Sequence, residues 1–173
     1  MLHQPIFIEG VFMKKTTHIL FTIYLFLIIW IILFKLSVSI DQLPHFRSFN
    51  LIPFYYPNKT DYQIREVLDN VIIFIPFGLY LKTLNINSER TVFLGFLLSL
   101  SLELSQYIFC MGASDITDLI TNTTGALIGV SLYYLLKKIF KEKTNKIILV
   151  LASIVTILFV SLIFIVLVNN ECT

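Results

Sequence analysis

Four long stretches without a charged residue constrain this chain more than any other feature of its sequence. They are residues 18–34, 91–102, 119–136 and 147–168. A helix that crosses a bilayer needs about 20 predominantly apolar residues, and about 17 is the lower limit. The second stretch reaches this length because only Glu103 interrupts it before Phe109. Each stretch therefore predicts a membrane-spanning helix.

A shorter apolar run over residues 71–81 predicts a fifth span when the flexible side chain of Lys82 is included at its end. Pro76 lies inside this run and is expected to kink the helix near Ile72, because proline removes one backbone hydrogen bond. Hydrophobic residues make up 57% of the 173 residues and charged residues only 14%, too few to cover a soluble domain. The predicted fold is an all-α integral membrane protein, a bundle of five transmembrane helices.

One domain accounts for most of the chain, because no internal repeat or low-complexity tract divides it. Met13 begins the segment "MKKTT", which resembles an alternative translation start. We therefore interpret residues 1–12 as an upstream extension and residues 13–173 as a single transmembrane domain. The first apolar stretch ends in "FKLSVS", which lacks the small-x-small pattern of a cleavage site, so we expect it to be retained.

The distribution of Lys and Arg predicts the orientation, because short cytoplasmic loops are enriched in these residues. A cytoplasmic N-terminus and an outer C-terminus place nine of the thirteen basic residues in the cytoplasm. The long loop between the first two helices, residues 37–68, is then outside, and its aromatic residues predict contact with the outer leaflet. Cys110 and Cys172 fall on the same side, so a disulfide and two unpaired cysteines are both open.

Polar residues recur at helical spacing within the third and fourth spans. A carboxylate in hydrocarbon costs about 2.5–3.5 kcal/mol or more, so Glu103 is expected to face a protein interior or a wet cavity. With the orientation above, it lies close to the outer end of its helix, as do polar residues of the second and fourth spans and of the outer loop. The predicted ligand pocket on the outer side comprises Arg47, Asn50, Asn70, Glu103, Gln106, Asp115, Asp118 and Asn122.

Structural roles compete with ligand binding at several of these positions. Asp115 is equally suited to be a helix N-cap, since Asp is preferred there. Gln106 suits a hydrogen bond between helices, and Glu103 suits an ion pair with Arg47. Gly125-x-x-x-Gly129 is better explained by close helix packing than by a ligand.

The sequence predicts no catalytic residue set, no metal site and no cofactor. Three carboxylates suit a hard cation, but no His lies near them and their spacing matches no metal motif. The chain also lacks a Gly-rich phosphate loop, and nothing in it indicates nucleic-acid binding. Its lysine-rich loop over residues 137–146 is explained by membrane topology and attraction to anionic lipid.

Three segments together resemble the VanZ family, over residues 16–134: "RSFNLIPF", "DNVIIFIPFGLYL" and "LSLSLELSQYIFCMGASDITDLITNTTGALIG". The resemblance implies a multi-pass protein of the bacterial plasma membrane that gives low-level resistance to teicoplanin, with little effect on vancomycin. The family pattern points to Arg47, Asn50, Pro53, Asn70, Pro76, Gly78, Glu103, Gln106, Asp115, Asp118, Asn122 and Gly125. We assign structural roles to Pro53, Pro76, Gly78, Gly125 and Gly129.

Two functional hypotheses follow, and a third is a purely structural partner of another membrane protein. The first is a non-enzymatic protein whose outer pocket binds or handles a membrane lipid or a lipid-linked cell-wall precursor, with an acylated glycopeptide as a further candidate ligand. The alternative is a membrane hydrolase or transferase that acts on a lipid-linked cell-envelope substrate. There, Glu103 and Asp118 would serve as acid and base, because two carboxylates in unlike environments can divide these roles.

Overall fold

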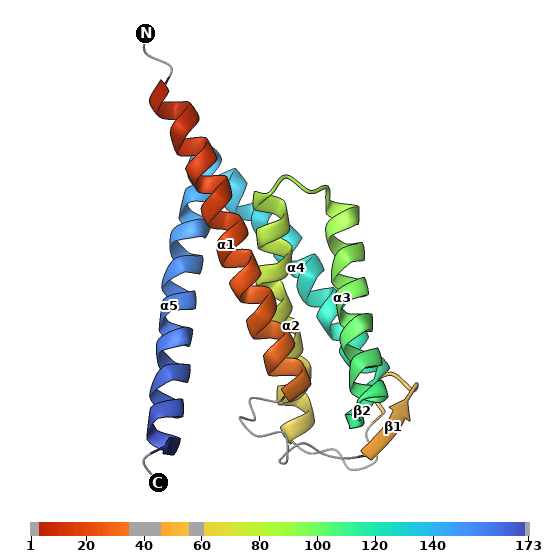
Figure 1. Ribbon diagram of the computed structural model, residues 1–173. Coiled ribbons are helices and arrows are strands. Elements are labelled where there is room, and N and C mark those ends of the chain that lie inside the picture. Colours follow the sequence, from red (N-terminus) through yellow and green to blue (C-terminus); the bar gives the residue numbers. More distant parts are fainter. Residues whose placement is uncertain (1–3, 35–45, 56–60, 172–173) are drawn as a thin grey trace.

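The computed structural model describes residues 4–34, 46–55 and 61–171. Its five long helices are α1 (Gln4–Phe34), α2 (Asp61–Thr83), α3 (Ser88–Ile108), α4 (Ile116–Phe140) and α5 (Thr144–Glu171). Two strands, β1 (Phe46–Asn50) and β2 (Met111–Asp115), and a 3-10 turn, η2 (Lys141–Lys143), complete the described elements. The helices form a bundle in which α4 runs obliquely behind α2 and α3 (Figure 1). The helical bundle agrees with the sequence prediction, whereas the two strands depart from the predicted all-α fold.

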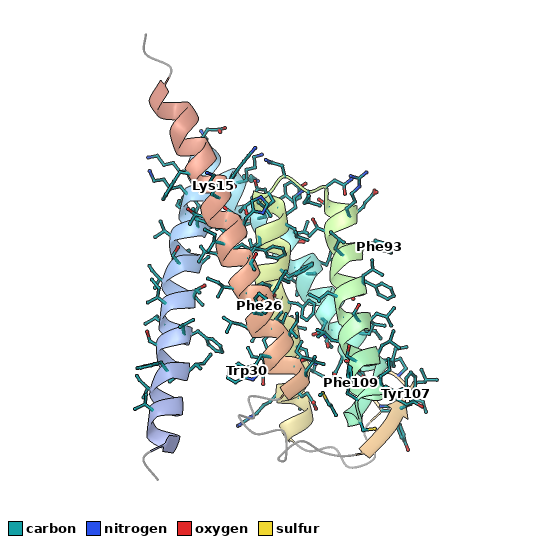
Figure 2. The ribbon with its side chains drawn as sticks, viewed as in Figure 1. Lys15, Phe26, Trp30, Phe93, Tyr107 and Phe109 are labelled. Carbon is teal, nitrogen blue, oxygen red and sulfur yellow. The ribbon has the colours of Figure 1, made fainter. Side chains whose placement is uncertain are left out.

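The elements end at two opposite ends of the bundle (Figure 1). The strands, the start of α2 and the end of α5 lie at the lower end in this view, which we call the sheet end. The start of α1, the turn from α2 to α3 and η2 lie at the upper end, which we call the lysine end (Figures 1 and 2). The helix ends and turns on that side carry Lys14, Lys15, Lys82, Arg90, Lys137, Lys138, Lys141, Lys143 and Lys146.

Three helical stretches among the described residues are long and apolar enough to cross a membrane. They are Phe12–Leu33, Ser88–Ile108 and Ile116–Ile165, the last of which runs from α4 through η2 into α5. Side chains along α5 such as Val155 and Leu158 are each 65% exposed, and such an apolar surface suits lipid rather than water. The chain is therefore a membrane protein. α2 is not among these stretches, because it begins at Asp61 and its first half is charged.

Glycines set the close contact between α2 and α4. A Cβ atom at Gly125 would overlap the carbonyl oxygen of Val71, and one at Gly129 would overlap that of Ile75. Gly78 faces the backbone of α4 in the same way. Small residues at a helix interface in a membrane let the two backbones approach closely. The close contact between α2 and α4 depends on these three glycines.

The core lies where α1, α2, α3 and α4 meet, and α2 contributes most of its large side chains. Its buried members are Ile28, Phe74, Phe77, Leu81, Leu102 and Ala126. α2 continues as a helix through Pro76. The hydroxyl of Tyr24 donates a 2.8 Å hydrogen bond to the carbonyl oxygen of Ile73, which joins α1 to α2 close to this proline.

The buried Lys82 closes the turn between α2 and α3 at the lysine end. Its ammonium donates to the carbonyl oxygen of Ile86 at 2.9 Å and lies 5.0 Å from the centre of the Tyr134 ring. The turn ends at Asn87, whose side chain caps α3 by accepting the backbone N–H of Arg90 at 2.8 Å. This end of the bundle is thus held by contacts of its own, separate from the predicted site.

Two further expectations from the sequence concern the N-terminal extension and the two cysteines. α1 begins at Gln4, so residues 4–12 of the proposed extension continue this helix. Cys110 lies between α3 and β2 at the sheet end, whereas Cys172 lies outside the described residues. A disulfide between them stays one of the two predicted alternatives.

Candidate functional site

β1 and β2 pair in parallel at the sheet end and bring two distant segments together (Figure 1). Arg47 lies opposite Gly112, and Asn50 lies opposite Asp115. Parallel strands need a long crossover connection, and α2 and α3 lie within it here. The pairing therefore places Asn50, from the loop after α1, directly beside the start of α4.

Asp115 ends β2 and caps α4. Its Oδ1 atom accepts a hydrogen bond of 2.7 Å from the backbone N–H of Thr117, which confirms the N-cap alternative. Its Oδ2 atom accepts a hydrogen bond of 3.0 Å from the side-chain amide of Asn50. One carboxylate thus fixes both the first turn of α4 and the end of β1.

Glu103 holds the junction between β2 and α4 from the neighbouring helix α3. Its Oε2 atom accepts the backbone N–H of Asp115 at 2.9 Å, and its backbone oxygen accepts the hydroxyl of Ser114 at 2.7 Å. Its side chain is 6% exposed, so this glutamate faces the protein interior, which is one of the two environments expected for it. Its Oε1 atom has no hydrogen-bond partner among the residues that the structure describes.

Two asparagines extend this arrangement along α4. The side-chain amide of Asn70, on α2, donates to Oδ1 of Asp118 at 2.8 Å. One turn further along α4, the amide of Asn122 donates to the hydroxyl of Ser99, on α3, at 3.0 Å. Asn122 is 1% exposed, and within the described part of the chain its Oδ1 atom has no partner.

Gln106 joins α3 to α1. Its amide donates a 3.0 Å hydrogen bond to the backbone oxygen of Ile32, the kind of contact between helices that the sequence suggested as its alternative role. The side chain is 5% exposed. Its Oε1 atom, like Oε1 of Glu103, is buried and finds no partner in the described segments.

We call these side chains at the sheet end the polar cluster. Its members come from both strands and from α2, α3 and α4, and they form contacts rather than one continuous chain of bonds. They are Asn50, Asn70, Ser99, Glu103, Gln106, Ser114, Asp115, Asp118 and Asn122.

Several predicted residues are not members of the polar cluster. The backbone of Arg47 lies in β1, but its side chain is outside what the structure describes, so the proposed ion pair with Glu103 stays a prediction. Pro53 lies in an exposed segment after β1, and Pro76 lies within α2. The predicted structural glycines Gly78, Gly125 and Gly129 all lie at the interface of α2 with α4.

Three hydroxyl side chains were missing from the predicted site. Ser114 and Ser99 accompany Glu103 and Asn122 as described above. Thr117 is fully buried, and its hydroxyl accepts the backbone N–H of Phe54 at 3.0 Å, which fastens the segment after β1 to α4. Ser99 lies in the helical stripe with Glu103, and this was a usable signal. The role of Thr117 depends on the strand pairing, which the sequence did not indicate.

The described residues contain no group of three or more His, Cys, Asp or Glu side chains positioned to hold a metal ion. The polar cluster instead combines carboxylates with amides and hydroxyls. Its geometry suits recognition by hydrogen bonds, and the three buried side-chain atoms that remain unpaired in it are oxygens of Glu103, Gln106 and Asn122.

Comparisons with known proteins identify the family of this chain. The family model described as VanZ/LLP1 matches residues 21–137, a range that contains the whole polar cluster. Protein VanZ of Enterococcus faecium is 45% identical over 131 residues, which cover 72% of this chain and 77% of that protein. No solved structure matches this chain significantly. The family match and this identity show that the chain belongs to the VanZ/LLP1 family.

Proposed function

We propose that this chain is a multi-pass protein of the bacterial plasma membrane that gives low-level resistance to teicoplanin. All five helices span the bilayer in this proposal, with the N-terminus in the cytoplasm and the C-terminus outside. The polar cluster then lies at the outer leaflet, where it binds or handles a lipid or a lipid-linked cell-wall precursor. Family membership supports the link to resistance, and the polar cluster supports a binding role.

The orientation is supported by the separation of charges between the two ends of the bundle. Five lysines lie within residues 137–146 at the lysine end, and positive charge is retained on the cytoplasmic side. The sheet end instead gathers exposed aromatic side chains, which include Tyr107 and Phe109 (Figure 2) and Phe49 of β1. Aromatic side chains favour the interface between membrane and water, which suits the outer surface.

A labelling experiment tests this orientation. In a Cys110→Ser, Cys172→Ser background, a cysteine that replaces the exposed Ala113 of β2 is expected to react with an impermeant thiol reagent in intact cells. A cysteine that replaces Lys143 of η2 is expected to react only after the membrane is permeabilised. Labelling of the Lys143 position in intact cells would reverse the orientation and move the polar cluster to the cytoplasmic face.

The observation that carries the binding role is the set of three unpaired acceptors in the polar cluster. A buried polar atom without a partner costs about 1–3 kcal/mol, and such atoms are retained where something else satisfies them. Glu103, Gln106 and Asn122 each contribute one such oxygen. A bound molecule that donates hydrogen bonds to them would recover this cost.

The location at the outer leaflet also explains discrimination between glycopeptides. Teicoplanin carries an acyl chain and vancomycin does not, and each buried CH₂ contributes about 0.8 kcal/mol to membrane binding. A protein at this leaflet acts on the membrane-held drug or on the lipids around its target, without changing the peptide that both drugs bind. Resistance is therefore expected to follow the lipid tail.

The test is a susceptibility series with glycopeptides that differ only in acyl-chain length. Cells that express the chain are compared with cells that carry an empty vector. We expect protection to decrease as the acyl chain is shortened and to vanish for the deacylated core. Equal protection against the deacylated core would contradict this mechanism. New lipid products made by the purified protein would replace binding with the hydrolase or transferase alternative.

A further inference from the structure

Some hydrogen-bond acceptors of the polar cluster have no partner, whereas each of its amide nitrogens donates a hydrogen bond. The amide nitrogens of Asn70, Gln106 and Asn122 each donate a hydrogen bond to a neighbouring helix. The amide nitrogen of Asn50 donates to Asp115. Every buried side-chain atom that the structure leaves unpaired in the described segments is an oxygen. A partner that satisfies these oxygens therefore brings hydrogen-bond donors.

Two of the unpaired oxygens belong to residues on the same face of α3. Glu103 and Gln106 are three residues apart, which places them about 4.5 Å apart along the helix axis and on neighbouring positions of one face. Both side chains are at least nine-tenths buried, with exposures of 6% and 5%. Their other polar atoms are occupied by the backbone of Asp115 and of Ile32, which holds each side chain in place.

The charge around this pair is negative. The carboxyl groups of Asp118, Asp115 and Glu66 are close enough to Glu103 to disfavour a negative charge on it. An anionic phosphate without donors would be repelled here, whereas a cation would be attracted. A calcium ion, for example, needs six or more oxygen ligands. The described residues contain no group of three or more His, Cys, Asp or Glu side chains that could hold a metal ion. A primary ammonium group combines a positive charge with three N–H donors.

We propose that Oε1 of Glu103 and Oε1 of Gln106 together accept hydrogen bonds from a primary ammonium group of a bound molecule. This inference rests on the proposed function and names the chemistry that the polar cluster recognises. The ammonium group belongs either to a lipid headgroup or to a water-borne amine. The Oδ1 atom of Asn122, beside Ser99 one turn from Glu103, offers a further acceptor to the same molecule.

A series of lipids that differ only in N-methylation tests the donors separately from the charge. The purified full-length chain is titrated in detergent with short-chain phosphatidylethanolamine, its mono- and dimethyl derivatives, and phosphatidylcholine. Trp30, the single tryptophan of the chain, provides the fluorescence signal. It lies on the lower half of α1 in Figure 2, two residues before the Ile32 carbonyl that binds Gln106.

We expect affinity to fall with each N–H that is lost, to at least about tenfold weaker for phosphatidylcholine, because hydrogen bonds to charged groups are strong. The positive charge is the same throughout the series. Equal affinity for phosphatidylethanolamine and phosphatidylcholine would overturn the proposal. The absence of any signal with phosphatidylethanolamine would overturn it as well.

A pair of matched variants locates the site. Glu103→Gln keeps an oxygen for the N–H of Asp115 but replaces the unpaired acceptor by an NH₂ group, so the preference for phosphatidylethanolamine is expected to disappear. Glu89→Gln makes the same chemical change at an exposed position on the same helix and is expected to bind as wild type does. If Glu103→Gln still preferred phosphatidylethanolamine, the assignment of the ammonium site to Glu103 would be contradicted.

The source of the ammonium group is decided by glycerophosphoethanolamine, which has the headgroup without acyl chains. Weaker binding than the intact lipid assigns the lipid, and equal binding assigns a water-borne amine; both support the ammonium site. Failure of this inference is separable from failure of the proposed function. If Glu103→Gln loses resistance while the methylation series is flat, the functional site stands and the ammonium assignment falls.

Discussion

Gly129→Ala is expected to lower the free energy of unfolding by about 1–2 kcal/mol, although alanine is the better helix former. The exchange of glycine for alanine within a helix contributes about 1 kcal/mol of stabilisation. Against this, the new Cβ atom would overlap the carbonyl oxygen of Ile75, and backbone cannot move aside as a flexible side chain can. Overpacking costs about 1–3 kcal/mol and occasionally more, and an overlap with a backbone atom falls in the upper half of that range. The clash therefore outweighs the gain in helix propensity.

Gly129→Leu extends this prediction, because a leucine would force α2 away from α4 over a longer distance. We expect this variant to be nearly absent from the membrane. Thermal unfolding of the purified Ala variant and membrane abundance of the Leu variant are the two measurements. Ser131→Leu is the control, since it adds a large side chain to an exposed position of the same helix. Wild-type stability of Gly129→Ala would show that α2 and α4 are not tightly packed at this point.

The features that the sequence predicted well are those set by local pattern. Long apolar stretches defined α1, α3, α4 and α5, because a bilayer demands uninterrupted apolar length. Helical spacing placed Glu103 and Asn122 on buried faces, and the glycines of α4 were assigned to packing. Lipid leaves little freedom for a carboxylate or for a polar amide in the middle of a helix, so burial followed from the sequence alone.

The features that the sequence did not predict depend on contacts between distant segments. The "FRSFN" and "MGASD" segments are short and carry no strong alternation, and each becomes a strand only because the other pairs with it. The role of Thr117 as the acceptor for Phe54 follows from that pairing. α2 begins at Asp61, well before the apolar run at 71–81, because a helix can continue outside hydrocarbon with charged residues.

Asp115 and Gln106 show why a local pattern cannot decide between structural and functional roles. Asp115 was equally suited to cap a helix or to serve a site, and both of its oxygens have partners in the structure. Gln106 binds α1 through its amide nitrogen and leaves its oxygen unpaired. The question for each side chain is therefore which of its atoms remains available, and that depends on the assembled structure.

Glu103 is the residue at which these two roles can be separated by experiment. Glu103→Gln is expected to abolish teicoplanin resistance while membrane abundance and thermal stability stay near wild type. The amide oxygen of the new side chain can still accept the N–H of Asp115, so the junction of β2 with α4 is kept. The substitution thus changes only the unpaired oxygen, which becomes an NH₂ group.

Glu103→Ala should lose resistance as well, but with a cost in stability that the Gln variant does not have. It leaves the buried N–H of Asp115 without its acceptor, which costs about 1–3 kcal/mol. Glu89→Gln and Glu89→Ala, at the other end of α3, control for the chemical change. If resistance followed stability across the Glu103 variants, with Gln active and Ala inactive, the carboxylate would serve the fold alone. Loss of resistance in both variants with loss of stability only in Ala assigns one oxygen of Glu103 to the fold and the other to function.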